Sequence, residues 1–244
     1  MSFDLTKTVG EVALENPSAT RVFEKCKIDY CCGGERTLGA ACRDAGADVD
    51  EVLVMLEGAA REQSGGDAAK DFQAMTLAEV IRHILDTHHA YARREMKHIA
   101  PLVERVFAAH GDRHEELGRV RALFLELCAD IEPHMMKEER ILFPYILALE
   151  ESARRKSAPP FAPFGSVENP IRMMLHEHDT AGQVLRELRA ASNDYFVPED
   201  VCTSYQLLFR ALEDFEQDLH RHVHLENNLL FPRALELEGA ARSI

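Results

Sequence analysis

Apolar residues recur every three or four positions through four long segments of this chain, as they do on the buried face of a helix. The segments cover about 76–108, 115–150, 168–192 and 198–237. We find no stretch of β-branched residues that alternates apolar and polar positions in the manner of a half-buried strand. A proline-rich connection, Ser157–Ser166, separates the second helix from the third. The pattern therefore predicts an all-α fold built on a four-helix bundle.

Shorter helical pieces precede the bundle. Thr8, Ser18 and Asp48 each stand before an apolar helical stretch and are suitable N-cap residues. The polar, glycine-bearing run Gln63–Asp67 follows, and such a composition is typical of a linker. The predicted organisation is a small helical domain at 1–62, a linker at 63–75 and a four-helix bundle at 76–238.

Composition and charge narrow the class of protein. Hydrophobic residues make up 46% of the 244 residues, aromatic residues only 7%, and tryptophan is absent, so we expect a largely aliphatic core. The net charge of −14 repels phosphate backbones and anionic lipids, which argues against a nucleic-acid or membrane partner. The chain has neither an apolar run of the roughly 20 residues that a membrane helix needs nor the pattern of a secretory signal. We expect a soluble cytoplasmic protein whose six cysteines are mostly reduced.

The second and fourth segments carry an internal repeat. HMMKEERILFP runs from His134 to Pro144, and HVHLENNLLFP runs from His222 to Pro232. Aligned without gaps, histidine matches histidine at the first position, glutamate matches glutamate at the fifth, and both copies end in Leu-Phe-Pro. A single His-x-x-x-Glu is usually a surface pair on a helix. Two copies in the same local context favour a shared chemical role.

Helical geometry selects the members of the repeat that can act together. At about 100° per residue, positions four apart differ by roughly 40° around a helix, so each histidine and its glutamate project from one face. By the same count, Glu139, His220 and His224 point elsewhere. Imidazole nitrogen and carboxylate oxygen together suit iron, manganese or zinc, and two such pairs in one bundle would form a carboxylate-bridged di-metal site. The consistent set is His134, Glu138, His222 and Glu226.

Further ligands are expected from the first and third helices. On the third helix, His178 lies on the apolar stripe that includes Leu175, whereas His176 does not. On the first helix, His89 lies on one apolar stripe and His88 on another, and periodicity leaves that choice open. Cys128 and Cys202, within apolar helix stretches, are predicted to be packing residues. A solvated surface position is favoured for five other histidines, which are His88, His110, His114, His176 and His224.

A resemblance to a known family covers nearly the whole chain. Residues 76–238 resemble a hemerythrin-like domain. Residues 1–62, with the run Asp29-Tyr30-Cys31-Cys32-Gly33-Gly34, resemble the small N-terminal domain of the iron–sulfur cluster repair di-iron proteins. Together with HMMKEE and LENNLLFP, the DYCCGG run makes the resemblance specific.

The resemblance implies a metal site and its ligands. It implies two non-haem iron ions bridged by the carboxylates of Glu138 and Glu226, with positions open to O₂, NO or an oxo bridge. It also favours His89 over His88. The implied iron ligands are His89, His134, Glu138, His178, His222 and Glu226.

The resemblance also implies a function. The expected role is repair of iron–sulfur clusters damaged by nitrosative or oxidative stress, by donation of iron, with damaged iron–sulfur proteins as clients. A metal-donating repair protein is favoured over a classical enzyme. The alternatives are a di-iron enzyme that reduces or scavenges NO, and a protein that binds O₂ or NO or buffers iron. Cys31 and Cys32 are predicted redox or iron-relay thiols, with a purely structural role as the alternative. A homodimer is compatible with exposed thiols.

Overall fold

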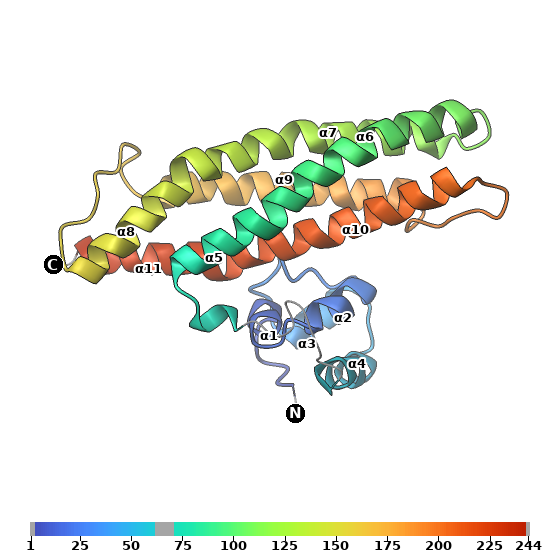
Figure 1. Cartoon of the computed structure of the whole chain (residues 1–244). Coiled ribbons are helices and arrows are strands. Elements are labelled where there is room, and N and C mark those ends of the chain that lie inside the picture. The colour runs from blue at the N-terminus through green and yellow to red at the C-terminus, as the bar shows by residue number, and fades with distance from the viewer. Residues whose placement is uncertain (1–2, 62–70, 243–244) are drawn as a thin grey trace. The chain divides into compact units, whose positions relative to one another are not determined.

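Helices make up nearly all the regular structure of the computed structural model, which describes residues 3–61 and 71–242. No strand occurs in those two ranges, where a lone bridge pairs Thr8 with Thr37. The prediction of an all-α fold is confirmed (Figure 1). The α-helices are α1 (Val9–Glu15), α2 (Ala19–Lys25), α3 (Leu38–Asp44), α4 (Val49–Arg61), α5 (Leu77–His83), α6 (Ala90–His110), α7 (Glu116–Lys137), α8 (Phe143–Arg155), α9 (Glu168–Ala191), α10 (Thr203–Leu225) and α11 (Phe231–Arg242). The described ranges also contain a 3₁₀ turn, η2 (Phe72–Ala74), and three π-helical turns, η3 (Ile84–His89), η4 (Glu138–Leu142) and η5 (Glu226–Leu230).

The chain divides into two compact units. The first comprises Met1–Arg82, Ile146–Pro163 and His220–Ile244, and the second comprises His83–Tyr145 and Phe164–Leu219. Helix α10 passes from the second unit into the first without a break. The predicted linker at 63–75 falls largely outside the described residues, and its described end forms η2 with Phe72 buried.

The second unit is a bundle formed by α6, α7, α9 and most of α10 (Figure 1). Phe124 from α7 and Phe215 from α10 meet edge to face, with ring centroids 5.9 Å apart. Around them lie leucines such as Leu127, Leu188 and Leu212, each fully buried. Burial of each leucine side chain stabilises the fold by about 2 kcal/mol. The bundle and its mostly aliphatic interior agree with the prediction.

Helices α1 to α4 of the first unit enclose a smaller core that includes Phe23, Tyr30 and Leu56. Thr8 caps α1 as predicted. Its hydroxyl accepts from the Glu11 N–H at 3.1 Å, and the Glu11 carboxylate accepts from the Thr8 N–H at 2.8 Å. This reciprocal capping box satisfies two backbone donors that a helix start leaves open.

The other two predicted caps differ in outcome. Asp48 accepts from the backbone N–H of Glu51 at 3.1 Å and caps α4. The prediction for Ser18 is wrong, because Ser18 has helical backbone angles and its side chain makes no capping bond. The turn through Asn16 and Pro17 replaces the cap, since the Asn16 carbonyl accepts from the Ala19 N–H at 2.8 Å.

Each copy of the sequence repeat contains a π-helical turn that begins at its glutamate. The Phe143 N–H donates to the Glu138 carbonyl, and the Phe231 N–H donates to the Glu226 carbonyl, five residues back in both cases. The next residue in each copy is proline, which has no N–H for an ordinary helical bond and crowds the carbonyl four residues earlier. The wider turn accommodates that proline. Such turns are frequent at functional sites.

A third π-turn explains why periodicity could not choose between His88 and His89. In η3 the Ala90 N–H donates to the Leu85 carbonyl, again five residues back. The extra residue shifts the buried stripe by one position, and both histidines are 1% exposed. The prediction of a surface position for His88 is therefore wrong. Its Nδ1 lies 3.1 Å from both carboxylate oxygens of buried Asp218.

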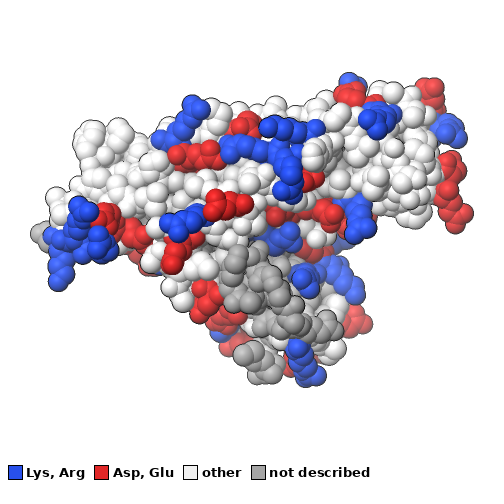
Figure 2. Space-filling view, in the orientation of Figure 1, with Lys and Arg blue, Asp and Glu red and all other residues white. Residues whose placement is uncertain are grey.

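The charged surface is mixed in sign. On the face drawn in Figure 2, acidic and basic side chains lie interspersed along the helices. That face carries no basic stripe of the kind that binds a phosphate backbone. Within the described ranges, no helix combines the length and apolar character needed to cross a membrane.

Candidate metal centre

Glu138 stands at the centre of a buried cluster in the second unit. It is fully buried at the start of η4. One carboxylate oxygen lies 3.3 Å from Nε2 of His89, and the other lies 3.3 Å from Nε2 of His134. His178, on α9, brings its Nε2 to 3.1 Å from Nε2 of His134. The structure therefore brings these four predicted ligands together, with one carboxylate facing two different imidazoles.

The stripe that carries His178 differs in one member from the prediction. Leu175 is 38% exposed, whereas Met174 is 2% exposed and occupies the buried position next to His178. His176 is exposed, as predicted. His178 is buried and His176 is not, which agrees with the choice between them, but Leu175 does not lie on the buried stripe.

Two carboxylates bind the imidazole rings of His89 and His134 on the side away from Glu138 and thereby orient the Nε2 lone pairs of these rings. Nδ1 of His89 lies 2.7 Å from Glu139, and Nδ1 of His134 lies 2.9 Å from Glu177. A carboxylate at Nδ1 keeps the proton on that nitrogen, so the Nε2 lone pair faces the cluster. Arg93 in turn donates to Glu139 at 2.7 Å, and Lys137 donates to Glu177.

Both supporting carboxylates are ionised. Partial burial acts to raise the pKa of Glu139, but the bonds from Arg93 and His89 outweigh it, and the pKa is lowered. The pKa of Glu177 is lowered in the same way, since Lys137 and His134 outweigh burial. Sequence reasoning excluded Glu139 as a partner of His134 and did not examine it against another helix. Glu177 gave no signal beyond its place beside His178.

The second copy of the repeat lies in the first unit. Nε2 of His222 is 3.0 Å from the Glu226 carboxylate, and both side chains are at most 2% exposed. The neighbouring histidines contact other groups, as the angular count predicted. His220 Nδ1 lies 2.8 Å from the Glu24 carboxylate, and His224 Nδ1 lies 3.2 Å from the Tyr30 carbonyl.

The environment of His224 corrects one prediction. It is 4% exposed instead of solvated, and its ring packs edge to face on Tyr30 with centroids 5.3 Å apart. Burial lowers the pKa of His224 to about 4, so it is neutral near pH 7. A neutral imidazole in this position serves the contact between the DYCCGG motif and α10.

The donor set fits a transition-metal ion. Glu138 and Glu226 are both fully buried, and burying a carboxylate is costly unless a cation or several donors compensate it. The groups that Glu138 faces in the second unit are imidazoles, and imidazole with carboxylate suits iron, manganese and zinc. In that unit, His134, Glu138 and His178 offer ligand atoms within 4.8 Å of one another.

The cysteine motif is a tight turn organised by Asp29. One carboxylate oxygen of Asp29 accepts from the backbone N–H groups of Cys31 at 3.2 Å, Cys32 at 2.9 Å and Gly33 at 3.0 Å. The two thiol sulfurs lie 4.0 Å apart. Cys31 is buried instead of exposed as expected, and its bond to Cys32 together with burial raises its pKa. Cys31 is therefore a protonated thiol near pH 7.

Two asparagines attach this motif to the turn that carries Glu226. Asn228 donates to the carbonyls of Tyr30 and Cys31, both at 3.2 Å, and Asn227 donates to the Cys31 carbonyl at 3.3 Å. A Cβ on Gly34 would lie 2.0 Å from the Asn228 side chain. The glycine is thus required for the close approach of the Asn228 side chain.

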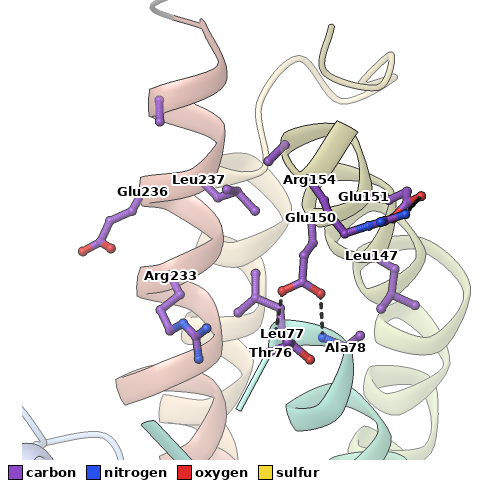
Figure 3. A pocket seen from close by; sticks show the side chains of 12 residues that line it. Thr76, Leu77, Ala78, Leu147, Glu150, Glu151, Arg154, Arg233, Glu236 and Leu237 are labelled. Atoms are coloured by element: carbon purple, nitrogen blue, oxygen red, sulfur yellow. Dashed lines mark hydrogen bonds and ion pairs between the residues drawn. The ribbon is translucent and has the colours of Figure 1, made fainter. Parts of the chain in front are cut away.

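A separate cavity of about 780 Å³ lies in the first unit, lined by α5, α8 and α11 (Figure 3). The Glu150 carboxylate accepts from the N–H groups of Leu77 and Ala78 at 2.7 and 3.0 Å. Arg233 donates to the Met75 carbonyl at 2.8 Å. These polar groups hold the start of α5.

Comparisons with known proteins identify the family of this chain. The family described as hemerythrin HHE cation binding domain matches residues 80–234, and the family described as a domain of unknown function, DUF542, matches residues 5–60. The chain is 37% identical to the iron-sulfur cluster repair protein YtfE of Dickeya chrysanthemi, over 95% of this chain and 98% of that protein. It is 33% identical to the probable iron-sulfur cluster repair protein of Haemophilus influenzae, over 96% of this chain and 99% of that protein. The resemblance inferred from the sequence is confirmed, and the chain belongs to the family of iron–sulfur cluster repair proteins that carry a hemerythrin HHE cation-binding domain.

Proposed function

We propose that six side chains of this protein hold two iron ions, with Glu138 and Glu226 as the bridging carboxylates. The position of Glu138 carries the proposal, because its two oxygens face the imidazoles of His89 and His134 separately. A carboxylate shared by two metal ions needs that arrangement. The repeat supports an equivalent role for Glu226, which begins the same π-turn after the same histidine spacing. The proposed ligands are His89, His134, Glu138, His178, His222 and Glu226.

The protein's own groups prepare this site before any metal binds. The rings of His89 and His134 are oriented by Glu139 and Glu177, so little reorientation is needed on binding. The surrounding residues exclude bulk water from both glutamates. Bound iron would supply the transferable metal, with coordination positions open to small ligands.

The function that we propose is repair of damaged iron–sulfur clusters by supply of iron. The curated relatives named for such repair match this chain over more than nine-tenths of its length. A site of imidazoles and carboxylates holds ferrous iron less firmly than ferric iron, so reduction would favour release. The transferred iron is the substrate of this process, and the clients are iron–sulfur proteins that have lost iron. Cytoplasmic nitrosative or oxidative damage is the condition in which we expect the activity.

Cys31 and Cys32 are proposed to take part as iron-relay or redox thiols. Their sulfurs lie 4.0 Å apart, and Asp29 adds an oxygen ligand within 4.8 Å. Asn227 and Asn228 hold the motif against the turn that begins at Glu226. A change at that turn can therefore reach the thiol pair through hydrogen bonds within one unit.

Iron analysis with Mössbauer spectroscopy tests the site. The wild-type protein should bind two irons with a coupled signal, and Glu138→Ala should lose that signal. A coupled pair retained in Glu138→Ala would overturn the bridging assignment. Zinc or manganese in the purified protein, with no iron bound on reconstitution, would overturn the choice of metal.

Iron transfer tests the function. Iron-loaded protein is mixed anaerobically with an apo iron–sulfur protein, with and without a reductant, and cluster formation is followed by visible absorption. Reductant-dependent transfer is expected, and it should weaken in Cys31→Ser if the thiols relay iron. Transfer that is absent or independent of reductant would contradict iron donation as the mechanism.

The thiol pair also favours one alternative, an enzyme that reduces NO. Two thiols can supply two electrons and two protons by forming a disulfide, which balances the conversion of two NO to N₂O and water. Head-space N₂O that depends on both Cys31 and Cys32 under anaerobic turnover would favour this alternative over donation.

A further inference from the structure

Cys202 occupies an unusual position at the start of α10. It is exposed and directly precedes the first helical residue, Thr203. The prediction that Cys202 is a packing residue is therefore wrong. The free backbone N–H groups of a helix start favour negative charge at this place. That favours the thiolate form of the side chain over the thiol.

A buried histidine from another helix contacts the same sulfur. Nε2 of His110, the last residue of α6, lies 3.1 Å from Sγ of Cys202. His110 is 7% exposed, which corrects its predicted surface position, and Nδ1 has no hydrogen-bond partner among the described residues. A proton on Nδ1 would be buried without an acceptor, so the stable neutral ring carries its proton on Nε2. That proton points at the sulfur.

Neighbouring groups hold the imidazole in place. The Tyr205 ring meets the His110 ring edge to face, with centroids 5.8 Å apart and planes at 84°. The Tyr205 hydroxyl donates to Glu116 at 3.2 Å. His114 lies 3.1 Å from Glu116 and 3.9 Å from Asp200. The His110 N–H donor is thus held in place, and the acidic Glu116 and Asp200 lie beside the neighbouring His114.

The thiol chemistry follows from these contacts. The backbone N–H of Tyr205, the His110 ring and the backbone N–H of Ser204 lower the pKa of Cys202 to about 7. Burial raises the pKa of Cys128 to about 12. Near neutral pH a large fraction of Cys202 is thiolate, whereas Cys128 remains protonated. Thiolate character and exposure together determine cysteine reactivity.

We propose that Cys202 and His110 form a second reactive-thiol site, separate from the metal centre, that forms a mixed disulfide with small cationic disulfides. The site lies about 30 Å from His89 along α6, at roughly 1.5 Å per residue. The Cys202 thiolate attacks one sulfur of the small disulfide, the S–S bond breaks, and the other half leaves as a thiolate that takes a proton from water. Exposed Glu199 and Asp200 favour a cationic disulfide such as cystamine over anionic glutathione disulfide.

The test measures mixed-disulfide formation on the full-length protein by mass spectrometry and peptide mapping, with cystamine, from pH 5.5 to 9.5. Cys202 should react with a midpoint near pH 7, while Cys128 in the same sample serves as the slow internal control. His110→Phe removes the N–H donor and should move the midpoint toward about 8.5, the value of an ordinary thiol. The rate at pH 7 should fall only about threefold, because a more basic thiolate is a better nucleophile.

Two matched variants separate chemistry from folding. His110→Gln keeps an N–H donor and should restore part of the shift, and Asp200→Asn should reduce the preference for cystamine over glutathione disulfide. A wild-type midpoint at or above 8.5 would overturn the proposal without reference to any variant. Equal midpoints in wild type and a folded His110→Phe would overturn the role of His110. The metal centre is not involved, so the result should be the same with and without iron.

Discussion

The two copies of the His-x-x-x-Glu repeat share a local structure and differ in what supports them. Both end an α-helix, begin a π-turn at the glutamate and continue through Phe-Pro. In the first copy, His134 is supported by Glu177 from α9 and the glutamate faces a histidine of another helix. In the second copy, the two residues after Glu226 bind the backbone of the cysteine motif. The same turn is thus coupled to the bundle in one copy and to the N-terminal helices in the other.

We infer that the surroundings of the first copy mainly affect metal binding, whereas those of the second copy mainly affect the cysteine motif. Changes around the first copy should alter metal affinity with little effect on the cysteine motif. Changes around the second copy's asparagines should alter the motif first. Each of the following experiments tests that division.

The largest effect is expected from Glu138→Gln and Glu226→Gln, which remove the charge and keep the volume. Both variants should lose the coupled iron pair, because each carboxylate is proposed to serve both ions. At metal concentrations near 1,000 times Kd, loss of binding removes about 4 kcal/mol of stabilisation of the folded protein. Calorimetric melting of iron-loaded and metal-free protein measures that difference.

The metal-free proteins provide the control for this pair. Without metal, replacing a buried carboxylate with a neutral amide should leave stability unchanged or raise it, since a desolvated charge is removed. Glu226→Gln that keeps one iron while Glu138→Gln keeps none would contradict a shared pair. It would indicate a single-metal site made by the four ligands of the second unit.

Replacing the supporting carboxylate, Glu177→Gln, is expected to weaken iron binding by about 10- to 100-fold. The amide no longer fixes the proton of His134 on Nδ1, although the ligand atoms all remain. Competition with a chelator measures the affinity. Glu187→Gln is the matched control, because Glu187 lies on the same helix and pairs with Arg119 at the surface. Equal affinities in the two variants would show that the contact at His134 has no influence on the metal.

At the second copy, Gly34→Ala should release the cysteine motif. The new Cβ would lie 2.0 Å from the Asn228 side chain, so Asn228 must turn away and lose its bonds to Tyr30 and Cys31. Two lost hydrogen bonds correspond to about 2 kcal/mol of local stability. Hydrogen exchange at residues 29–34 should accelerate, and Cys31 should become open to alkylation.

Gly39→Ala is the control for Gly34→Ala. Its Cβ would meet nothing closer than 3.6 Å, and alanine suits a helix better than glycine. We expect no loss of protection in that variant. Iron affinity should be nearly unchanged in both, and a large loss of iron in Gly34→Ala alone would show that the motif contributes to holding the metal.

Local rules predicted much of this molecule because they involve residues close in sequence. Period and spacing identified the four long helices and the histidine–glutamate pairs, and Thr8 and Asp48 were correct caps. These local rules failed where residues far apart in the sequence contact one another. The partners Glu177 for His134 and Glu139 for His89 come from different helices, and burial of His224 depends on Tyr30, nearly two hundred residues away. The choice between His88 and His89 failed for a local reason, since a π-turn breaks the period that the stripe analysis assumes.

The smallest effect is expected from Thr8→Ala, which tests the N-terminal helices without touching the bundle. The change removes the hydroxyl that accepts from the Glu11 N–H and leaves the bond from the Thr8 backbone N–H to the Glu11 carboxylate in place. Loss of the side-chain cap should lower the stability of these helices by about 1 kcal/mol. Because Gly10 of α1 packs against Asn228, amide hydrogen exchange should become modestly faster in residues 9–15 and at the cysteine motif. Thr37→Ala is the comparison, because Thr37 caps α3 through a single 3.4 Å bond and should cost less. Iron affinity equal to wild type in both variants would support the division between the two copies, since a weakened N-terminal helix would then leave the metal ligands unaffected.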